Sequence, residues 1–222
     1  LLKATRAQFL GIETKLEELK GQRTHSLTVG MSSYFASRWL SPRLMSFMQL
    51  FPDIQLRIQP MTQLFDLERQ GVDVAIRWGN GAWDDVEITP FLTMPAWPTG
   101  NSDVAKRVKT IGLERAFSEL TLLRDHDDSS AWSDWHKAAG LSHQMRKDTL
   151  IIPDPNVRVQ AVIDGQGIAL NDRLIKQEIE EGKLVRLSEV ELSSYGYFLA
   201  RPASGPNAHS VEEFVQWLKD TQ

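Results

Sequence analysis

The 222-residue sequence contains no cysteine and no long hydrophobic run. The lack of cysteine excludes disulfide frameworks, cysteine-bearing zinc sites, iron–sulfur clusters and thiol nucleophiles, and it suits a reducing compartment. No segment approaches the roughly 18 apolar residues of a membrane-spanning helix, and nothing at the start resembles a signal peptide. We therefore expect a cytoplasmic protein that has no membrane partner.

A strong positive charge is also missing, since the formal net charge is −4. Residues 1–25 carry five basic and three acidic side chains, which leaves a net charge of −6 on the remainder. A surface that holds the phosphate backbone of nucleic acid is expected to be basic. The sequence therefore predicts that the globular body does not bind DNA by itself.

Catalytic signatures are absent as well. There is no G-x-S-x-G, no H-E-x-x-H and no P-loop. The run Asp125-His126-Asp127-Asp128 resembles a metal site in composition, but adjacent side chains point in different directions and no second His or Glu completes a ligand set. We interpret this run as a solvated loop. We expect no enzymatic activity, no metal and no cofactor.

What the sequence does contain is an ordinary globular composition, with 41% hydrophobic and 24% charged residues. At about 150 residues per domain, the length allows one large domain or two small lobes. Residues 1–21 are predicted to form a helix ended by Gly21, because apolar side chains recur there every seven positions on two offset rows. Three heptads are too few to hold a dimer alone. This helix is therefore either a linker that pairs with a second chain or an amphipathic helix lying on its own domain. The rows are Leu2, Phe9 and Leu16, and Ile12 and Leu19.

The body alternates predicted strands and helices. Strands are predicted at 27–31, 54–58 and 72–78, with a long helix kinked at Pro42 and a short helix over 62–70 between them. This order predicts a parallel sheet with right-handed crossovers. After a Pro- and Gly-containing segment at 94–100, which we interpret as a crossing between lobes, the topology repeats with less regularity. Later elements are helices at 130–139, from Asp154-Pro155 and at 172–181, and strands at 149–152, 167–170 and 195–200.

Three segments resemble the effector-binding domain of LysR-type transcriptional regulators. They are LTVGMSSYFASRWLSPRLMSFMQLFPDIQLRI (27–58), GVDVAIRWGNGAW (71–83) and AVIDGQGIAL (161–170). The second is similar to the branch that includes the glycine-cleavage activator and the chromosomal β-lactamase regulator. The resemblance covers essentially the whole chain. One departure is residues 94–102, MPAWPTGNS, where the family usually has a smoother strand.

This resemblance implies an α/β fold with two Rossmann-like lobes of the periplasmic-binding-protein type II fold, joined by two crossings and preceded by a linker helix. We expect the linker helix over 1–21, lobe 1 over 26–96 and 171–222, and lobe 2 over 97–170. A small effector would bind between the lobes. DNA would be bound only through the family's N-terminal winged helix-turn-helix, which is missing before Leu1. The resemblance thus implies a fragment of a longer regulator.

The resemblance also implies a dimer formed side by side, and a tetramer for the full-length protein. We place residues 34–59 in the dimer interface, since Gln55 and Arg57 form a wet face of the predicted second strand. The alternative is a periplasmic solute-binding protein, which has the same fold. That alternative requires an export signal and has no use for a helix with heptads.

Candidate effector-binding residues follow the carboxyl ends of predicted strands, where ligands of open α/β sheets bind. Ser32, Ser33 and Tyr34 begin a helix whose N-terminus attracts anions, although a serine there also serves as a helix cap. The segment after the third predicted strand offers either flat apolar walls for a ligand or an ordinary surface turn. The aspartate in the predicted short helix is either a partner for a ligand amine or an exposed helix carboxylate. These candidates are Trp78, Asn80 and Trp83, and Asp66.

The candidates beyond the crossing lie at the start of lobe 2, in the acidic loop and at a second helix N-terminus. They are Thr99, Gly100, Asn101, Asp127, Asp154 and Asn156, with Tyr197 on the return strand. Two helix N-termini that face each other across a cleft suit a ligand with polar groups at both ends. We therefore expect a small organic acid or an amino-acid-like molecule as the effector.

Overall fold

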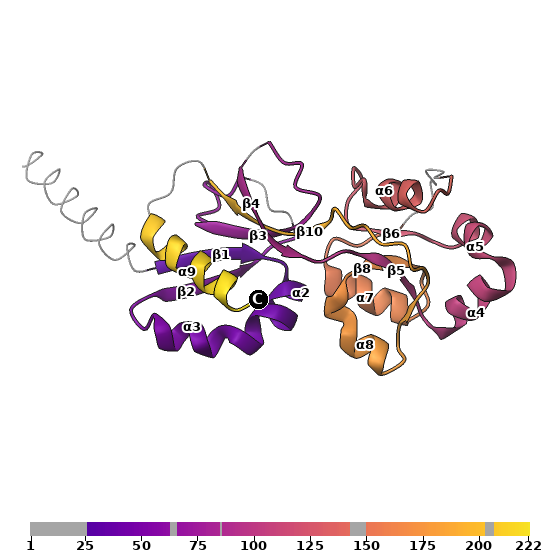
Figure 1. Cartoon of the computed structure of the whole chain (residues 1–222), viewed down its shortest axis with the longest axis horizontal. Helices are drawn as coiled ribbons and strands as arrows, with labels where there is room; N and C mark the ends of the chain where they lie inside the picture. The colour runs from indigo at the N-terminus through magenta and orange to yellow at the C-terminus, as the bar shows by residue number, and fades with distance from the viewer. Residues whose placement is uncertain (1–25, 63–65, 85, 143–149, 203–206) are drawn as a thin grey trace, which may run out of the picture.

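The computed structural model describes residues 26–62, 66–84, 86–142, 150–202 and 207–222. Figure 1 shows them as two α/β lobes placed side by side along the longest axis, with extended segments passing between the lobes. The predicted helix over 1–21 lies outside the described residues. Among the helices that are described, none is both long and apolar enough to cross a membrane.

Lobe 1 is built on a five-stranded sheet in the order β2-β1-β3-β10-β4. Pairing of β1 with β2 and with β3 is parallel, as predicted from the alternation of strands and helices. The return strand β10 is antiparallel to both β3 and β4. The strands are β1 (Ser26–Met31), β2 (Gln55–Pro60), β3 (Val74–Gly79), β4 (Glu87–Thr93) and β10 (Gly196–Arg201).

The helical segment after β1 changes its winding around Pro42, as the sequence predicts. It runs through α2 (Ser33–Phe35), a π-helical turn η1 (Ala36–Leu40), a 3₁₀ turn η2 (Ser41–Arg43) and α3 (Leu44–Leu50). Proline lacks the N–H that an α-helix needs at this position, so the hydrogen-bond pattern shifts locally.

The C-terminal helix α9 (Ala208–Asp220) packs beside α3. The centroid of the Phe47 ring lies 5.3 Å from that of Phe214 and 5.1 Å from that of Trp217.

The predicted short helix over 62–70 is wrong for residues 66–70. These residues form turns, in which Asp66 has a φ of +51°.

Lobe 2 carries the antiparallel sheet β8-β5-β9 and the parallel pair β6-β7, which a bridge between Leu122 and Ile168 connects. Its core contains Phe117, Trp132 and Trp135. The strands are β5 (Trp97–Gly100), β6 (Leu123–Arg124), β7 (Leu150–Ile151), β8 (Ala169–Asn171) and β9 (Val185–Arg186). The helices are α4 (Ser102–Ile111), α5 (Leu113–Glu119), α6 (Ala131–Ala138), α7 (Pro155–Ile163), the 3₁₀ turn η3 (Arg173–Ile175) and α8 (Lys176–Glu180).

The second crossing corrects one predicted boundary. The sequence interpretation ended lobe 2 at residue 170, but β9 hydrogen-bonds to β5 and therefore keeps the chain in lobe 2 beyond Arg186. The chain returns to lobe 1 only between Leu192 and Gly196, where Leu192 forms an antiparallel bridge to Ala96 on the outgoing crossing. The short β9 strand has only two residues, which is too little alternation to be recognised in a sequence.

Candidate functional site

A cavity of about 120 Å³ lies between the two lobes. On the side of lobe 1 it is lined by Ser32 after β1, Thr62 after β2 and Trp78 near the end of β3. These are the carboxyl ends of three parallel strands, which is the place where open α/β sheets bind ligands. Lobe 2 contributes residues from the loop after β6, from α7 and from the end of β8.

Arg158 lines this cavity from the first turns of α7. Its Nη1 donates a hydrogen bond of 2.6 Å to the carbonyl oxygen of Ile152, and its side chain has no other hydrogen bond or ion pair within the described residues. Burial lowers the pKa of the guanidinium, and the charge of Asp125 opposes this shift. Arginine remains protonated in proteins. Arg158 therefore presents a positive charge and several unused N–H donors to the cavity.

Asp125 lines the same cavity from the loop after β6. Its Oδ1 accepts a hydrogen bond of 3.1 Å from the backbone N–H of His126, and its Oδ2 lies 3.5 Å from Nε2 of that imidazole. Asp125 and Arg158 form no ion pair with each other, both lying within the described ranges. The cavity is thus flanked by a positive and a negative charge that do not neutralise each other directly.

Asp172 is a buried carboxylate that joins the two lobes. Its Oδ1 accepts hydrogen bonds from the Tyr34 hydroxyl (2.8 Å) and the Leu174 N–H (2.9 Å), and its Oδ2 accepts one from the Tyr197 hydroxyl (2.8 Å). Burial raises the pKa of Asp172, while these hydrogen bonds work in the opposite direction. Burial and the Asp172 charge raise the pKa of both tyrosines well above the ordinary value. The tyrosines therefore remain neutral donors.

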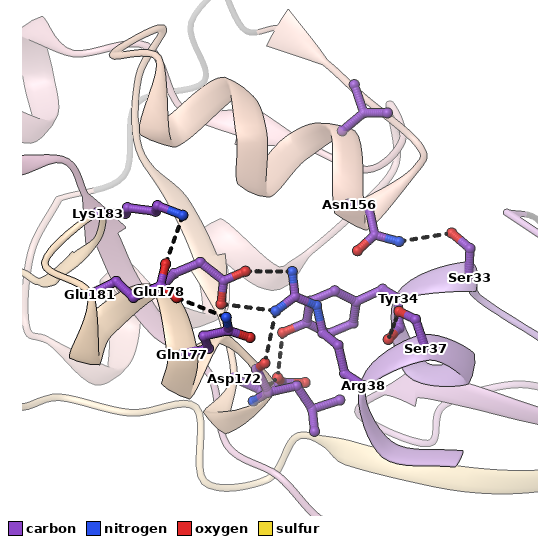
Figure 2. A network of polar contacts seen from close by, with 12 residues as sticks. Ser33, Tyr34, Ser37, Arg38, Asn156, Asp172, Gln177, Glu178, Glu181 and Lys183 are labelled. Carbon is purple, nitrogen blue, oxygen red and sulfur yellow. Dashed lines mark hydrogen bonds and ion pairs between the residues drawn. The ribbon is translucent and has the colours of Figure 1, made fainter. Parts of the chain in front are cut away.

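An ion pair lies beside this carboxylate, as Figure 2 shows. Arg38 Nη1 donates to Glu178 Oε2 (2.9 Å) and to the Leu174 carbonyl oxygen (3.1 Å), and Arg38 Nη2 lies 2.6 Å from Glu178 Oε1. Burial alone would lower the pKa of Arg38, but the hydrogen bond and charge of Glu178 raise it. We call the set Tyr34, Arg38, Asp172, Glu178 and Tyr197 the interlobe network, because it joins lobe 1 to lobe 2.

A further contact joins the lobes where the first helix of lobe 1 faces α7 (Figure 2). The Ser33 hydroxyl donates to Asp154 Oδ2 (3.0 Å) and accepts from Asn156 Nδ2 (3.1 Å). Asp154 Oδ1 meanwhile caps α7 by accepting the N–H groups of Asn156 and Val157. The two predicted helix N-termini therefore do face each other, and their side chains bind one another.

The predicted site residues divide into groups according to their position. Ser32, Tyr34, Trp78 and Tyr197 line the cavity. Ser33, Asp154 and Asn156 form the interlobe contact just described. Asn80 and Trp83 line a neighbouring groove of about 300 Å³, which shares Trp78 and Asp125 with the cavity.

Five of the predicted residues lie outside the cavity, the interlobe contact and the neighbouring groove. Thr99 is fully buried, where its hydroxyl donates to the Ala169 carbonyl oxygen. Gly100 has no room for a side chain, since a Cβ would lie 2.5 Å from Val104. The remaining three are Asn101, whose Oδ1 caps α4, and Asp66 and Asp127, which are exposed.

Sequence reasoning missed Asp125, Arg158 and Asp172. Asp125 follows a buried strand, so the rule that nominated Trp78 would also have found it. Arg158 is a charged side chain between the apolar Val157 and Val159 of α7, which is a weaker signal. Nothing in the sequence indicates that Asp172 would meet two tyrosines that lie 138 and 25 positions away.

The family pattern described as the LysR substrate binding domain matches residues 20–222. The chain belongs to this family. It is 32% identical over 206 residues to the HTH-type transcriptional activator AmpR of Rhodobacter capsulatus, covering 91% of this chain and 69% of the relative. It is 30% identical over 195 residues to the glycine cleavage system transcriptional activator of Escherichia coli K12, covering 87% of this chain and 64% of the relative. The chain thus spans about two thirds of the length of these relatives.

Solved structures agree with this assignment. The effector domain of AmpR from Pseudomonas aeruginosa matches with a TM-score of 0.77 and 28% identity, covering 88% of this chain and 94% of that chain. The predicted α/β fold with two lobes is confirmed, as is the effector-binding domain of a LysR-type regulator, and the transport-protein alternative is not favoured. The relatives are transcriptional regulators. Over the part of the chain that the structure describes, no three His, Asp or Glu side chains gather as a metal site.

Proposed function

We propose that this chain senses a small organic molecule that carries a carboxylate, and that the molecule binds in the cavity between the lobes. The observation that carries this proposal is Arg158, which lines the cavity while using only one of its N–H groups on the described protein. A guanidinium binds a carboxylate through parallel hydrogen bonds. The flat ring of Trp78 gives the ligand an apolar wall.

Ligand binding acts on the arrangement of the lobes in this proposal. Tyr34, Asp172 and Tyr197 line the cavity and also belong to the interlobe network. A ligand in the cavity therefore contacts the same groups that join the lobes. Since a ligand shifts a conformational equilibrium only by binding one state better than the other, these shared residues provide the necessary difference in contacts.

The test is titration of the protein with short-chain carboxylic acids and amino acids, followed by tryptophan fluorescence and by the melting temperature. We expect saturable changes that the Arg158→Gln variant loses. Arg173→Gln is the matched control, because Arg173 lies in the same lobe with an exposed side chain. Unchanged signals for the whole panel, or equal binding by the Arg158→Gln variant, would contradict the proposal.

We further propose that the chain associates with itself through lobe surfaces. Large apolar side chains are exposed on α3, where Met45, Met48 and Leu50 are 69%, 44% and 65% exposed, and again in lobe 2 near β7. Beside α3 lies the edge strand β2, on which Arg57 is exposed. These features support the placement of residues 34–59 in a side-by-side dimer interface.

Sedimentation tests this interface. Leu56 packs partly against the core of lobe 1, so a charge at that position would also disturb the fold. The sharper variant is Met45→Glu combined with Arg57→Glu, which places negative charges on the exposed surface only. We expect this variant to sediment as a monomer, and an unchanged dimer would refute the placement.

In the full regulator, we propose that DNA is bound by a separate DNA-binding domain, as the description of the AmpR relative as an HTH-type activator suggests. The acidic net charge of residues 26–222 supports the assignment of DNA binding to a separate domain. The complete protein would then act in the cytoplasm, where bacterial DNA lies, as a dimer or tetramer. Binding of DNA by this chain alone in a gel-shift assay would contradict this assignment.

A further inference from the structure

The carboxylates at the interlobe cleft differ in how many of their oxygen atoms the protein already uses. Asp154 accepts hydrogen bonds at both oxygens, from Ser33 and from the α7 backbone. Asp172 likewise accepts from both tyrosines and from Leu174 N–H. Asp125 differs, because the one polar neighbour of its Oδ2 among the described residues is Nε2 of the His126 imidazole, at a distance of 3.5 Å. Asp125 is therefore the carboxylate that still has an oxygen to offer to a ligand.

Two arginines near the cleft show the same contrast. Arg38 is committed to Glu178 and to the carbonyl oxygen of Leu174. Arg158 has one hydrogen bond within the described residues, to Ile152. One positive and one negative group, Arg158 and Asp125, are therefore left facing the same cavity with most of their bonding capacity unused.

We infer that the effector is a zwitterion of the amino-acid type, whose carboxylate binds Arg158 and whose protonated amine binds Asp125. This inference rests on the proposed function and narrows its ligand class. A carboxylate without an amine would pair with Arg158 but would bring a second negative charge close to Asp125, which is unfavourable. A zwitterion satisfies both groups at once, and neither charge remains unpaired in the cavity.

The size of the cavity limits the side chain of such a ligand. The space of about 120 Å³ is somewhat smaller than the cavity of about 150 Å³ that accepts a benzene molecule in another protein. This volume suits an amino acid with a short side chain in the present arrangement of the lobes. Trp78 then contacts the side chain where the cavity adjoins the neighbouring groove, since it lines both.

The test compares amino acids with the carboxylates that differ from them only by lacking the amine. Glycine is paired with acetate, L-alanine with propionate and L-serine with 3-hydroxypropionate, and each dissociation constant is measured by calorimetry at one pH and salt concentration. We expect at least one amino acid to bind the wild-type protein about tenfold or more tightly than its partner. In the Asp125→Asn variant, whose amide oxygen can still accept the His126 N–H, we expect this ratio to fall to about one.

Asp127→Asn is the matched control, because it removes the same charge from the same loop at an exposed position. It should leave the ratio of dissociation constants unchanged. Equal affinity for the paired ligands in the wild-type protein, or an unchanged ratio in Asp125→Asn, would overturn the inference while leaving the carboxylate site at Arg158 intact. Failure of every carboxylate and amino acid to bind would instead overturn the proposed function together with the inference.

Discussion

The interlobe network lies beside the same cavity as Arg158 and Asp125. The charges of the network have partners within the protein, whereas Arg158 and Asp125 form no ion pair with each other. In the network, the Asp172 carboxylate and the Arg38 guanidinium are bound by partners from the opposite lobe. Arg158 and Asp125 line the cavity without pairing with each other. Apart from Arg38 Nε, which is buried without a hydrogen-bond partner among the described residues, the network therefore resembles the satisfied polar interior of a folded protein, whereas the pair resembles a binding site.

This difference indicates what each region contributes. Buried polar groups that are fully hydrogen-bonded define one arrangement of the lobes. Arg158 and Asp125 are half-buried at the cavity and form no ion pair with each other. A ligand that pairs with Arg158 and Asp125 would therefore recover an interaction that the fold itself does not make. Because the two regions share the cavity, the proposed function links ligand binding to the arrangement of the lobes.

The largest effect is expected from Asp172→Ala. This change leaves the Tyr34 and Tyr197 hydroxyls and the Leu174 N–H buried without their acceptor, so the free energy of unfolding should fall by about 3 kcal/mol. Chemical denaturation measures it. Asp127→Ala, an exposed aspartate in lobe 2, should change stability by less than about 0.5 kcal/mol. Similar losses from both variants would show that the network is not a special source of stability.

Arg158→Met should weaken ligand binding without reducing stability, in contrast to Asp172→Ala. We expect its affinity for the best carboxylate ligand to fall by about 100-fold, equivalent to about 2.7 kcal/mol, because a charge-assisted pair is lost. The free energy of unfolding of the unliganded protein should stay equal or rise, since a charge that lacks a carboxylate partner has been removed. Calorimetry and denaturation check the two quantities separately. A large loss of stability would mean that Arg158 belongs with the structural groups.

Alkaline pH should weaken the fold through the tyrosines. All three tyrosines of the chain have raised pKa values, and that of Tyr195 is raised to about 12 by burial and by its hydrogen bond to Asp134. In the unfolded chain, tyrosine ionises near pH 10. Above this pH the folded state holds more protons than the unfolded state, so the free energy of unfolding falls as pH rises, by about 1.4 kcal/mol per pH unit for each tyrosine that stays neutral.

The Tyr197→Phe variant isolates one member of the network in this pH dependence. Between pH 10 and 11, its free energy of unfolding, measured by urea denaturation, should fall by about 1 kcal/mol less than that of the wild-type protein. An unchanged slope would indicate that Tyr197 ionises normally in the folded state, and therefore that its contact with Asp172 does not persist at that pH.

The smallest effect is expected from the partly exposed ion pair. The side chains of Arg38 and Glu178 are 21% and 14% exposed, so their coupling energy should be about 1 kcal/mol. A double-mutant cycle with Arg38→Met and Glu178→Gln measures it. If the network holds the lobes in the ligand-binding arrangement, both single variants should also weaken ligand binding. Ligand affinity that is unaffected by either change would separate the ion pair from the cavity.

Much of the fold was predictable because local patterns record it. The alternating strand around Val29, the kink at Pro42 and the start of α7 at Asp154-Pro155 all lie where the sequence places them. These features depend on backbone chemistry and on side-chain periodicity, which act over a few residues. The boundary of lobe 2 was misplaced because β9 has two residues and is recognised only by its partner β5.

The candidate site was only partly predictable. The rule that ligands bind at the carboxyl ends of parallel strands found Ser32, Tyr34 and Trp78, which line the cavity. The same rule failed for Thr99, because β5 runs antiparallel to its neighbours and the Thr99 hydroxyl is used within its own sheet. The rule therefore holds for β1 and β3 of lobe 1, which are parallel neighbours.

The sequence by itself determined the family, the two-lobed α/β architecture and the helix N-termini that face each other across the cleft. Only the tertiary structure decided which charged groups are satisfied and which remain available. Nothing in the sequence around Asp125, Arg158 and Asp172 separates a charge that the fold satisfies from one that it leaves available. Their roles differ because hydrogen bonding and burial depend on neighbours far away along the chain, and folding gives Asp172 two tyrosines while it leaves Arg158 and Asp125 facing the cavity.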